Sequence, residues 1–162
     1  MKLSNTMLVL VLTIFSLACQ KNMIQETNGT TTPTTESSAK VTGVRITGEP
    51  GNYNLSVTLE SPDTGCDQYA DWWEVFTPDG TLIYRRILAH SHVDEQPFTR
   101  SGGPVSVTAD QEIIVRGHMN NRGYGTQVFR GTIGEGLAQS TLAVDVAASL
   151  ESTDPLPQSC AF

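Results

Sequence analysis

A strict alternation of apolar and polar residues over Tyr53–Glu60 constrains the fold of this chain more than any other feature. Tyr53, Leu55, Val57 and Leu59 share one face of an extended segment, and the residues between them are polar. Because successive side chains of a strand point to opposite faces, the pattern predicts a strand with one buried and one exposed face. Strands of this kind are typical of antiparallel sheets that cover a core on one side.

Further segments with strand character follow at close spacing and are separated by turn-forming residues. The predicted strands are 41–49, 53–60, 72–77, 81–88, 105–108, 112–119, 126–133 and 142–146. Pro78-Asp79-Gly80 predicts a hairpin turn between the strands 72–77 and 81–88. Residues 137–150 could form a short Ala-rich helix instead of the last strand. About seven or eight short strands favour an all-β fold, an antiparallel immunoglobulin-like β-sandwich, with a small barrel as the alternative.

The first 18 residues have the pattern of an export signal. Lys2 precedes the apolar run 7–15, which is shorter than the roughly 20 residues of a spanning helix. Ser16-Leu17-Ala18 then leads to Cys19. A cysteine directly after a small residue at a cleavage point resembles bacterial lipoprotein precursors, whose cysteine receives a lipid such as palmitate. The resemblance covers 1–19 and implies anchoring through Cys19; Ser16-x-Ala18 also fits an ordinary secretory signal.

The organisation that follows is a signal peptide over 1–18, a tether over 19–40 and a β-sandwich domain over 41–162. The tether is rich in Thr and Ser and too poor in apolar residues to fold, which predicts disorder. Gln20 is not the Asp that marks inner-membrane retention in enterobacterial lipoproteins. By this resemblance we expect a lipid-anchored envelope protein on the outer membrane, with the domain on its periplasmic or surface face.

The cysteine count agrees with lipidation of Cys19. It leaves Cys66 and Cys160 as an even pair in an oxidising compartment, and we predict a disulfide between them. The bond would close a loop of about 95 residues, worth roughly 4–5 kcal/mol by loop entropy. A pair of free or metal-binding thiols is the alternative, although no Cys-x-x-Cys spacing supports it.

The negative charge of the chain argues against two kinds of partner. The net charge is −7, and removal of the signal peptide takes away Lys2 and no acid, which leaves −8. Such a surface argues against nucleic acid and against polybasic contact with a membrane. The membrane contact is therefore expected through the lipid alone, and an envelope protein or a glycan is the expected partner of the domain.

The three histidines are the candidate metal ligands. His90 and His92 are two residues apart, so both point to one face of an extended segment, and His118 ends the predicted strand 112–119. If these segments are neighbours, three imidazoles could hold Cu or Zn. The alternative is that all three are ordinary residues near strand ends and that the protein has no cofactor.

Acidic and aromatic residues supply two weaker candidates. Loop carboxylates could hold calcium, although Asp63 also suits a turn-capping role; they are Asp63, Asp67, Asp71, Asp94 and Glu95. Trp72 and Trp73 are expected opposite Arg86 and Arg85. One of these pairs could be an exposed platform for a carbohydrate or peptide, and the favoured alternative is ordinary packing of the tryptophans in the sandwich.

Two loops and one serine complete the list of candidates. The loops 100–104 and 120–125 are rich in Gly, Asn and Arg, and they suit either adaptable binding or plain strand connections. Ser91 lies between two histidines, but its neighbours in a strand point to the opposite face and cannot easily serve as its base. We therefore expect a non-enzymatic binding or structural lipoprotein, with a periplasmic Cu/Zn binder or a small hydrolase as alternatives.

Overall fold

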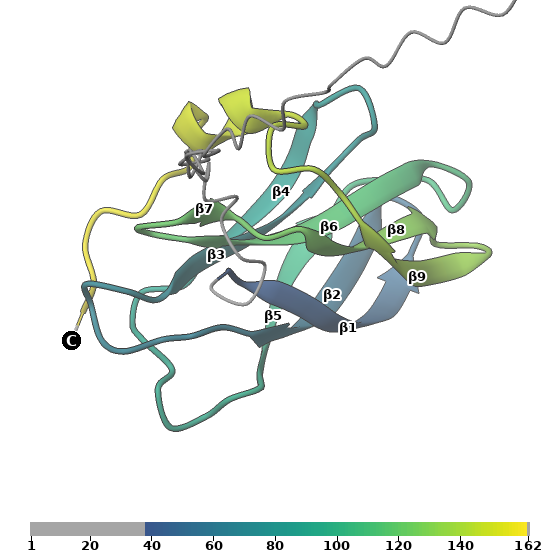
Figure 1. Cartoon of the computed structure of the whole chain (residues 1–162). Helices are drawn as coiled ribbons and strands as arrows, with labels where there is room; N and C mark the ends of the chain where they lie inside the picture. The colour runs from purple at the N-terminus through teal and green to yellow at the C-terminus, as the bar shows by residue number, and fades with distance from the viewer. Residues whose placement is uncertain (1–37, 162) are drawn as a thin grey trace, which may run out of the picture. The chain divides into compact units, whose positions relative to one another are not determined.

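Two antiparallel sheets pack face to face in the computed structural model, which describes residues 38–161 (Figure 1). The first sheet has the order β1-β2-β5, with β1 Lys40–Glu49, β2 Asn52–Glu60 and β5 Phe98–Val105. The second has the order β4-β3-β6-β8-β9. Its strands are β3 Ala70–Phe76, β4 Leu82–Ile87, β6 Glu112–Met119, β8 Gln127–Thr132 and β9 Gly136–Thr141, and β7 Gly123–Tyr124 pairs with the end of β6. The predicted all-β antiparallel sandwich is confirmed; its immunoglobulin-like character stays a prediction.

The core lies between the two sheets and follows the alternation in the sequence. Leu55, Val57 and Leu59 of β2 are fully buried, as their period predicts. From the second sheet, Trp73 and Val115 face them and are equally inaccessible to solvent. The predicted hairpin turn at Pro78-Asp79-Gly80 joins β3 to β4, and Gly80 takes the positive φ that such turns require.

The strand β5 differs from the prediction, which placed a loop at 100–104 and a strand at 105–108. Residues Phe98–Val105 pair with β2 instead, although two adjacent glycines weaken the local preference for a strand. Tertiary packing explains them, because a Cβ at Gly102 would lie 2.5 Å from the hydroxyl oxygen of Tyr84. A glycine required by a distant side chain leaves no local signal.

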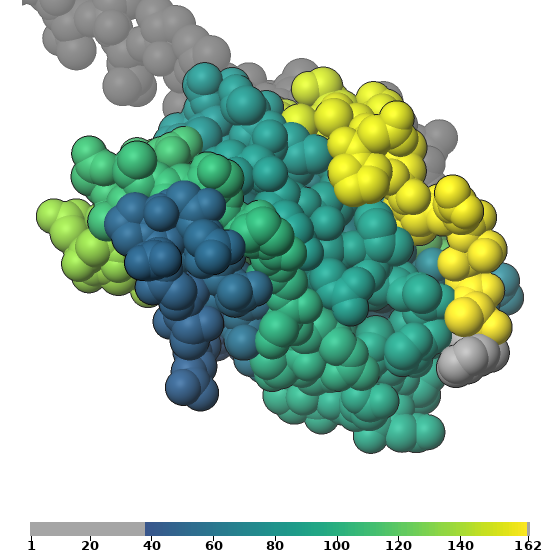
Figure 2. Space-filling view, turned by 180° about the vertical axis from the view of Figure 1, so that it is seen from behind, coloured from purple at the N-terminus to yellow at the C-terminus, as the bar shows by residue number. Residues whose placement is uncertain are grey.

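The end of the chain also differs from the prediction of a strand at 142–146. The last strand is β9, and the chain then leaves the sheet as the C-terminal segment, residues 142–161. This segment contains a 3-10 helix, η2 (Ala148–Ser152), and no α-helix forms in the described part of the chain. Figure 2 shows the segment, in yellow, on the surface of the domain.

The C-terminal segment adds a third layer over the outer face of the second sheet. Leu150 is its buried apolar anchor and packs with a second apolar cluster, separate from the main core. The sheet contributes Trp72, Phe76, Ile114, Tyr124 and Val128 to this cluster. The central strands β3 and β6 of the second sheet are therefore buried on both faces, which the sequence pattern did not predict.

The loop end of the sandwich, as we name it, gathers the loops 61–69 and 88–97 and the turn 120–122. The strand pairings place the start of β1 at this end, because Lys40 lies opposite Glu60. Ala39 packs there so closely that a Cβ at Gly125 would lie 1.7 Å from its carbonyl oxygen. Residues 38–161 contain no helix with the length and apolar character needed to cross a membrane.

Candidate functional site

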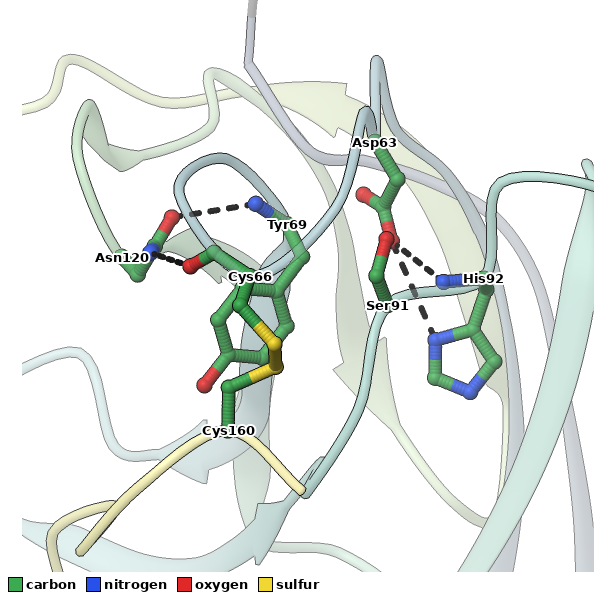
Figure 3. Close-up of a disulfide and its surroundings, with 7 residues drawn as sticks. All are labelled: Asp63, Cys66, Tyr69, Ser91, His92, Asn120 and Cys160. Atoms are coloured by element: carbon green, nitrogen blue, oxygen red, sulfur yellow. Dashed lines mark hydrogen bonds and ion pairs between the residues drawn. A yellow bond between two sulfur atoms is a disulfide. The ribbon is translucent and has the colours of Figure 1, made fainter. Parts of the chain in front are cut away.

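Asp63 organises the loop end from a fully buried position (Figure 3). Its Oδ1 accepts hydrogen bonds from the Ser61 hydroxyl at 2.7 Å and from the Ala70 amide at 3.0 Å. Its Oδ2 accepts from the His92 amide at 2.8 Å and from the Ser91 hydroxyl at 3.4 Å. A carboxylate with four such donors joins the turn 61–65 to β3 and to the loop of Ser91 and His92, and it leaves little room for calcium. Ser91 points to this carboxylate and not to an imidazole.

The predicted disulfide is present at the same end of the sandwich. Cys66 and Cys160 are joined, with their Cα atoms 5.5 Å apart. Asn120, in the turn after β6, fixes the loop that carries Cys66, because its amide donates to the Cys66 carbonyl at 2.9 Å and accepts from the Tyr69 amide at 3.0 Å. The residue predicted in an adaptable loop is therefore a brace between two loops.

A buried ionic cluster lies on the outer face of the second sheet, under the C-terminal segment. Glu74 on β3 is fully buried between Arg85 on β4 and Arg116 on β6. Its carboxylate accepts from Arg85 Nε at 2.9 Å and Nη2 at 2.5 Å, from Arg116 Nε at 2.8 Å, and from Trp72 Nε1 at 3.2 Å. One carboxylate thus compensates two buried guanidinium groups.

The same two arginines hold the C-terminal segment by its backbone. Arg116 donates to the carbonyls of Val146 at 2.7 Å and Ala147 at 3.0 Å. Arg85 donates to three more carbonyls, those of Leu150, Thr153 and Pro155. The cluster therefore fastens residues 146–155 to the sheet and has a structural role.

His118 links the sheet to the same segment. Its Nδ1 is 2.6 Å from Asp71 Oδ1, and its Nε2 is 3.0 Å from Glu151 Oε1 on η2. The ring stacks on Trp72, with centroids 3.5 Å apart and planes 7° apart. Both ring nitrogens are thus engaged with carboxylates, and His118 has no open position for a metal ion.

The structure does not gather the three predicted histidines into a metal site. Within residues 38–161, no group of three or more His, Cys, Asp or Glu side chains is placed to hold an ion. His90 and His92 are neighbours, with ring centroids 4.5 Å apart and planes 34° apart. This pair has no third ligand beside it in the described residues and so lacks the set that three imidazoles would provide. His92 also stacks on Phe98, at 3.8 Å.

His92 is the least satisfied polar group in the described residues. It is 1% exposed, and neither ring nitrogen has a hydrogen-bond partner there. Burial lowers the pKa of His92 below its ordinary 6.5, and the positive charges of Arg100 and His90 lower it further. Asp63 and Glu95 act in the opposite direction. The fold therefore favours the neutral form of this imidazole.

The tryptophans pack in the interior, as the favoured alternative had it, and form no exposed platform, but the predicted register is wrong. Trp73 lies opposite Arg86 and Glu74 opposite Arg85, one residue away from the expected pairing. Both tryptophans are buried: Trp73 in the main core and Trp72 under the C-terminal segment. Arg85 does stack on Trp72 at 4.5 Å, but the pair is covered.

An open groove of about 580 Å³ remains as the candidate binding surface. One wall is the turn after β6, with Asn121 and Arg122, and the other is the C-terminal segment, with Asp145 and Glu151. One wall residue is held by a neighbouring loop, because Asn121 donates to the Asp67 carbonyl at 2.9 Å. The groove thus presents amide, guanidinium and carboxylate groups on a fixed backbone.

Glu74 and Arg116, which organise the outer face, were not among the residues predicted from the sequence. A signal for them exists, because each is a charge with apolar or small neighbours inside a strand, Glu74 between Trp73 and Val75 and Arg116 between Val115 and Gly117. Opposite charges at such positions indicate a buried ion pair once the strands are known to be neighbours. That β3 and β6 are neighbours, with Glu74 opposite Arg116, is known only from the tertiary structure.

Comparison with known proteins gives one informative similarity. The chain is 44% identical over 75 residues to a protein of Halomicrobium mukohataei named "Putative lipoprotein". The match covers 46% of this chain, which spans only 37% of the length of that relative. No family model matches the chain, and no solved structure does. The name of the relative is consistent with the predicted lipoprotein signal.

Proposed function

We propose that the protein is an envelope lipoprotein that is anchored through Cys19 and presents a non-enzymatic binding domain. Two observations support the anchor: the lipoprotein-like pattern of residues 1–19 and the similarity to a protein named as a lipoprotein. An outer-membrane position is the finer part of this proposal and follows from Gln20 after the cysteine. The domain is the part that meets the partner.

The groove between the turn after β6 and the C-terminal segment carries the binding proposal. Its walls offer hydrogen-bonding groups of both charges, Arg122 against Asp145 and Glu151, which suits a neutral ligand rich in hydroxyl groups. The braces of Asn120 and Asn121 fix one wall before binding, which reduces the entropy lost on association. We therefore propose an envelope glycan as the ligand.

Lipid anchoring is tested by expressing the full chain in a bacterial host with labelled palmitate. The wild type should carry the label and sediment with membranes, and Cys19→Ser should lose both. A wild-type chain that is secreted without label would show that Ser16-x-Ala18 serves ordinary secretion, and the anchor would be refuted.

Ligand binding is tested by calorimetry with neutral cell-wall glycan fragments. The double variant Arg122→Ala/Asp145→Ala should weaken binding by about 10-fold or more, as expected for two lost charged hydrogen bonds. Arg130→Ala is the matched control, because Arg130 is an exposed arginine on β8 outside the groove. Absence of binding, or equal binding by both variants, would refute the groove as the site.

A further inference from the structure

We propose that the end of the C-terminal segment is a redox latch: the disulfide Cys66–Cys160 holds a terminal tail, residues 156–161, that opens when a dithiol reduces the bond. The proposal is independent of the glycan-binding role. It rests on how differently the two sides of the bond, and the two halves of the C-terminal segment, are fixed.

The Cys66 side is fixed without the disulfide. The loop around Cys66 is closed by the backbone hydrogen bonds from Thr64 to Gln68 and from Gln68 to Gly65. Asn120 holds the Cys66 carbonyl from the next turn. Loss of the bond therefore leaves this loop in place.

The first half of the C-terminal segment is also fixed without the disulfide. Arg85 and Arg116 donate to five of its carbonyls, the last of which belongs to Pro155. Leu150 adds a buried apolar anchor. Residues up to Pro155 are therefore expected to stay on the sheet after reduction.

The terminal tail has fewer contacts than the Cys66 loop and the first half of the C-terminal segment. Leu156–Ser159 belong to no strand or helix and make no backbone hydrogen bond to the other described residues. Leu156 is 38% exposed, and it joins neither apolar cluster. Ala161 donates to the Ala89 carbonyl at 2.6 Å. Ordering such a stretch costs conformational entropy, and the disulfide at its end is the main interaction that offsets this cost.

The bond is open to attack, because both cysteines are only half-buried. A thiolate of an external dithiol attacks one cysteine sulfur, forms a mixed disulfide and displaces the other cysteine as thiolate. The second thiolate of the reductant then attacks the reductant's own sulfur in the mixed disulfide and displaces the remaining cysteine as thiolate. Two electrons pass to Cys66 and Cys160, which take up protons, and the reductant leaves as a disulfide.

Hydrogen exchange on the folded full chain tests the latch, before and after dithiothreitol at neutral pH. Exchange of the Ala161 amide, which donates to the Ala89 carbonyl, should rise by about 10-fold or more, while exchange in 142–155 and in the strands stays unchanged. An unchanged tail would overturn the proposal, as would a rise throughout the domain, which would make the bond a global staple. A bond that resists dithiothreitol under native conditions would also overturn it.

A truncated chain provides a second test that does not depend on reduction. The variant Cys66→Ser that ends at Pro155 should fold and melt at the temperature of the reduced wild type, because the tail contributes nothing once the bond is open. Ser159→Ala in the oxidised chain is the matched control for the exchange experiment and should keep slow exchange of the Ala161 amide. A truncated chain that melts well below the reduced wild type would show that the reduced tail remains docked.

Discussion

Replacing Glu74 by glutamine should be the most damaging single isosteric change in the domain. The substitution keeps the shape of the side chain but removes the charge that faces two buried guanidinium groups. Glu74 is 0% exposed and Arg116 is 0% exposed, so water cannot replace the lost carboxylate. Breaking a buried ion pair from one side costs about 3–5 kcal/mol, out of a total stability of roughly 5–15 kcal/mol for a domain.

The assay is urea unfolding of the full chain, followed by tryptophan fluorescence. A loss of about 3–5 kcal/mol should also lower the melting temperature by roughly 10–20 °C in a domain of this size. Glu112→Gln is the matched control: Glu112 pairs with Arg130 at 2.6 Å, but both side chains are more than 40% exposed. An exposed pair of this kind is worth about 0–1 kcal/mol.

The result that would refute this reasoning is a Glu74→Gln variant within about 1 kcal/mol of its control. It would mean that the guanidinium groups find sufficient compensation in the carbonyls of the C-terminal segment. Replacing all members of a buried ionic triad by apolar residues is often harmless in other proteins. Here the same replacement of Glu74, Arg85 and Arg116 would leave five backbone carbonyls of the C-terminal segment without donors.

Three further predictions concern His92 and Asp63 at the loop end and the contact between Gly125 and Ala39. Because burial holds the pKa of His92 below 6.5, the unfolded state binds more protons as the pH falls through that value. The free energy of unfolding should therefore decrease below about pH 6.5, and His92→Leu should flatten this part of the pH profile of urea midpoints. Asp63→Asn, which exchanges an acceptor for a donor facing amides, should cost about 2–3 kcal/mol in the same assay at pH 7; a cost below that of an ordinary surface change would contradict its organising role. Gly125→Ala should lower the melting temperature strongly because its Cβ would collide with the Ala39 carbonyl, whereas Gly43→Ala, with only ordinary contacts, should be tolerated; equal effects would show that residue 39 moves aside freely.

Local sequence patterns were sufficient for the main core. The alternation in Tyr53–Glu60 depends only on the two-residue period of a strand, and the hairpin turn at 78–80 depends only on the conformations open to Pro and Gly. The disulfide followed from parity of the cysteines in an exported chain, and the structure confirms it. The lipid on Cys19 stays a prediction, since residues 1–37 lie outside the described part of the chain.

The candidate site could be predicted only in pieces. The turn 120–125 and His118 were singled out from residue type, but their partners, Cys66 and Glu151, are distant in sequence. The predicted metal site failed for the same reason, because spacing along the chain places His90 beside His92 but does not place His118. Residue type indicates which groups can do chemistry, and only their neighbours decide what they do.

The sequence by itself determined the class of fold and the inner faces of the strands, because burial against one core imposes a local period that can be counted along the chain. Only the tertiary structure decided the fate of the outer face of the second sheet. Trp72 would have been exposed in an open sandwich, but the C-terminal segment covers it. That segment has no period of its own, because it is held through backbone carbonyls by Arg85 and Arg116, and a carbonyl is the same in every residue.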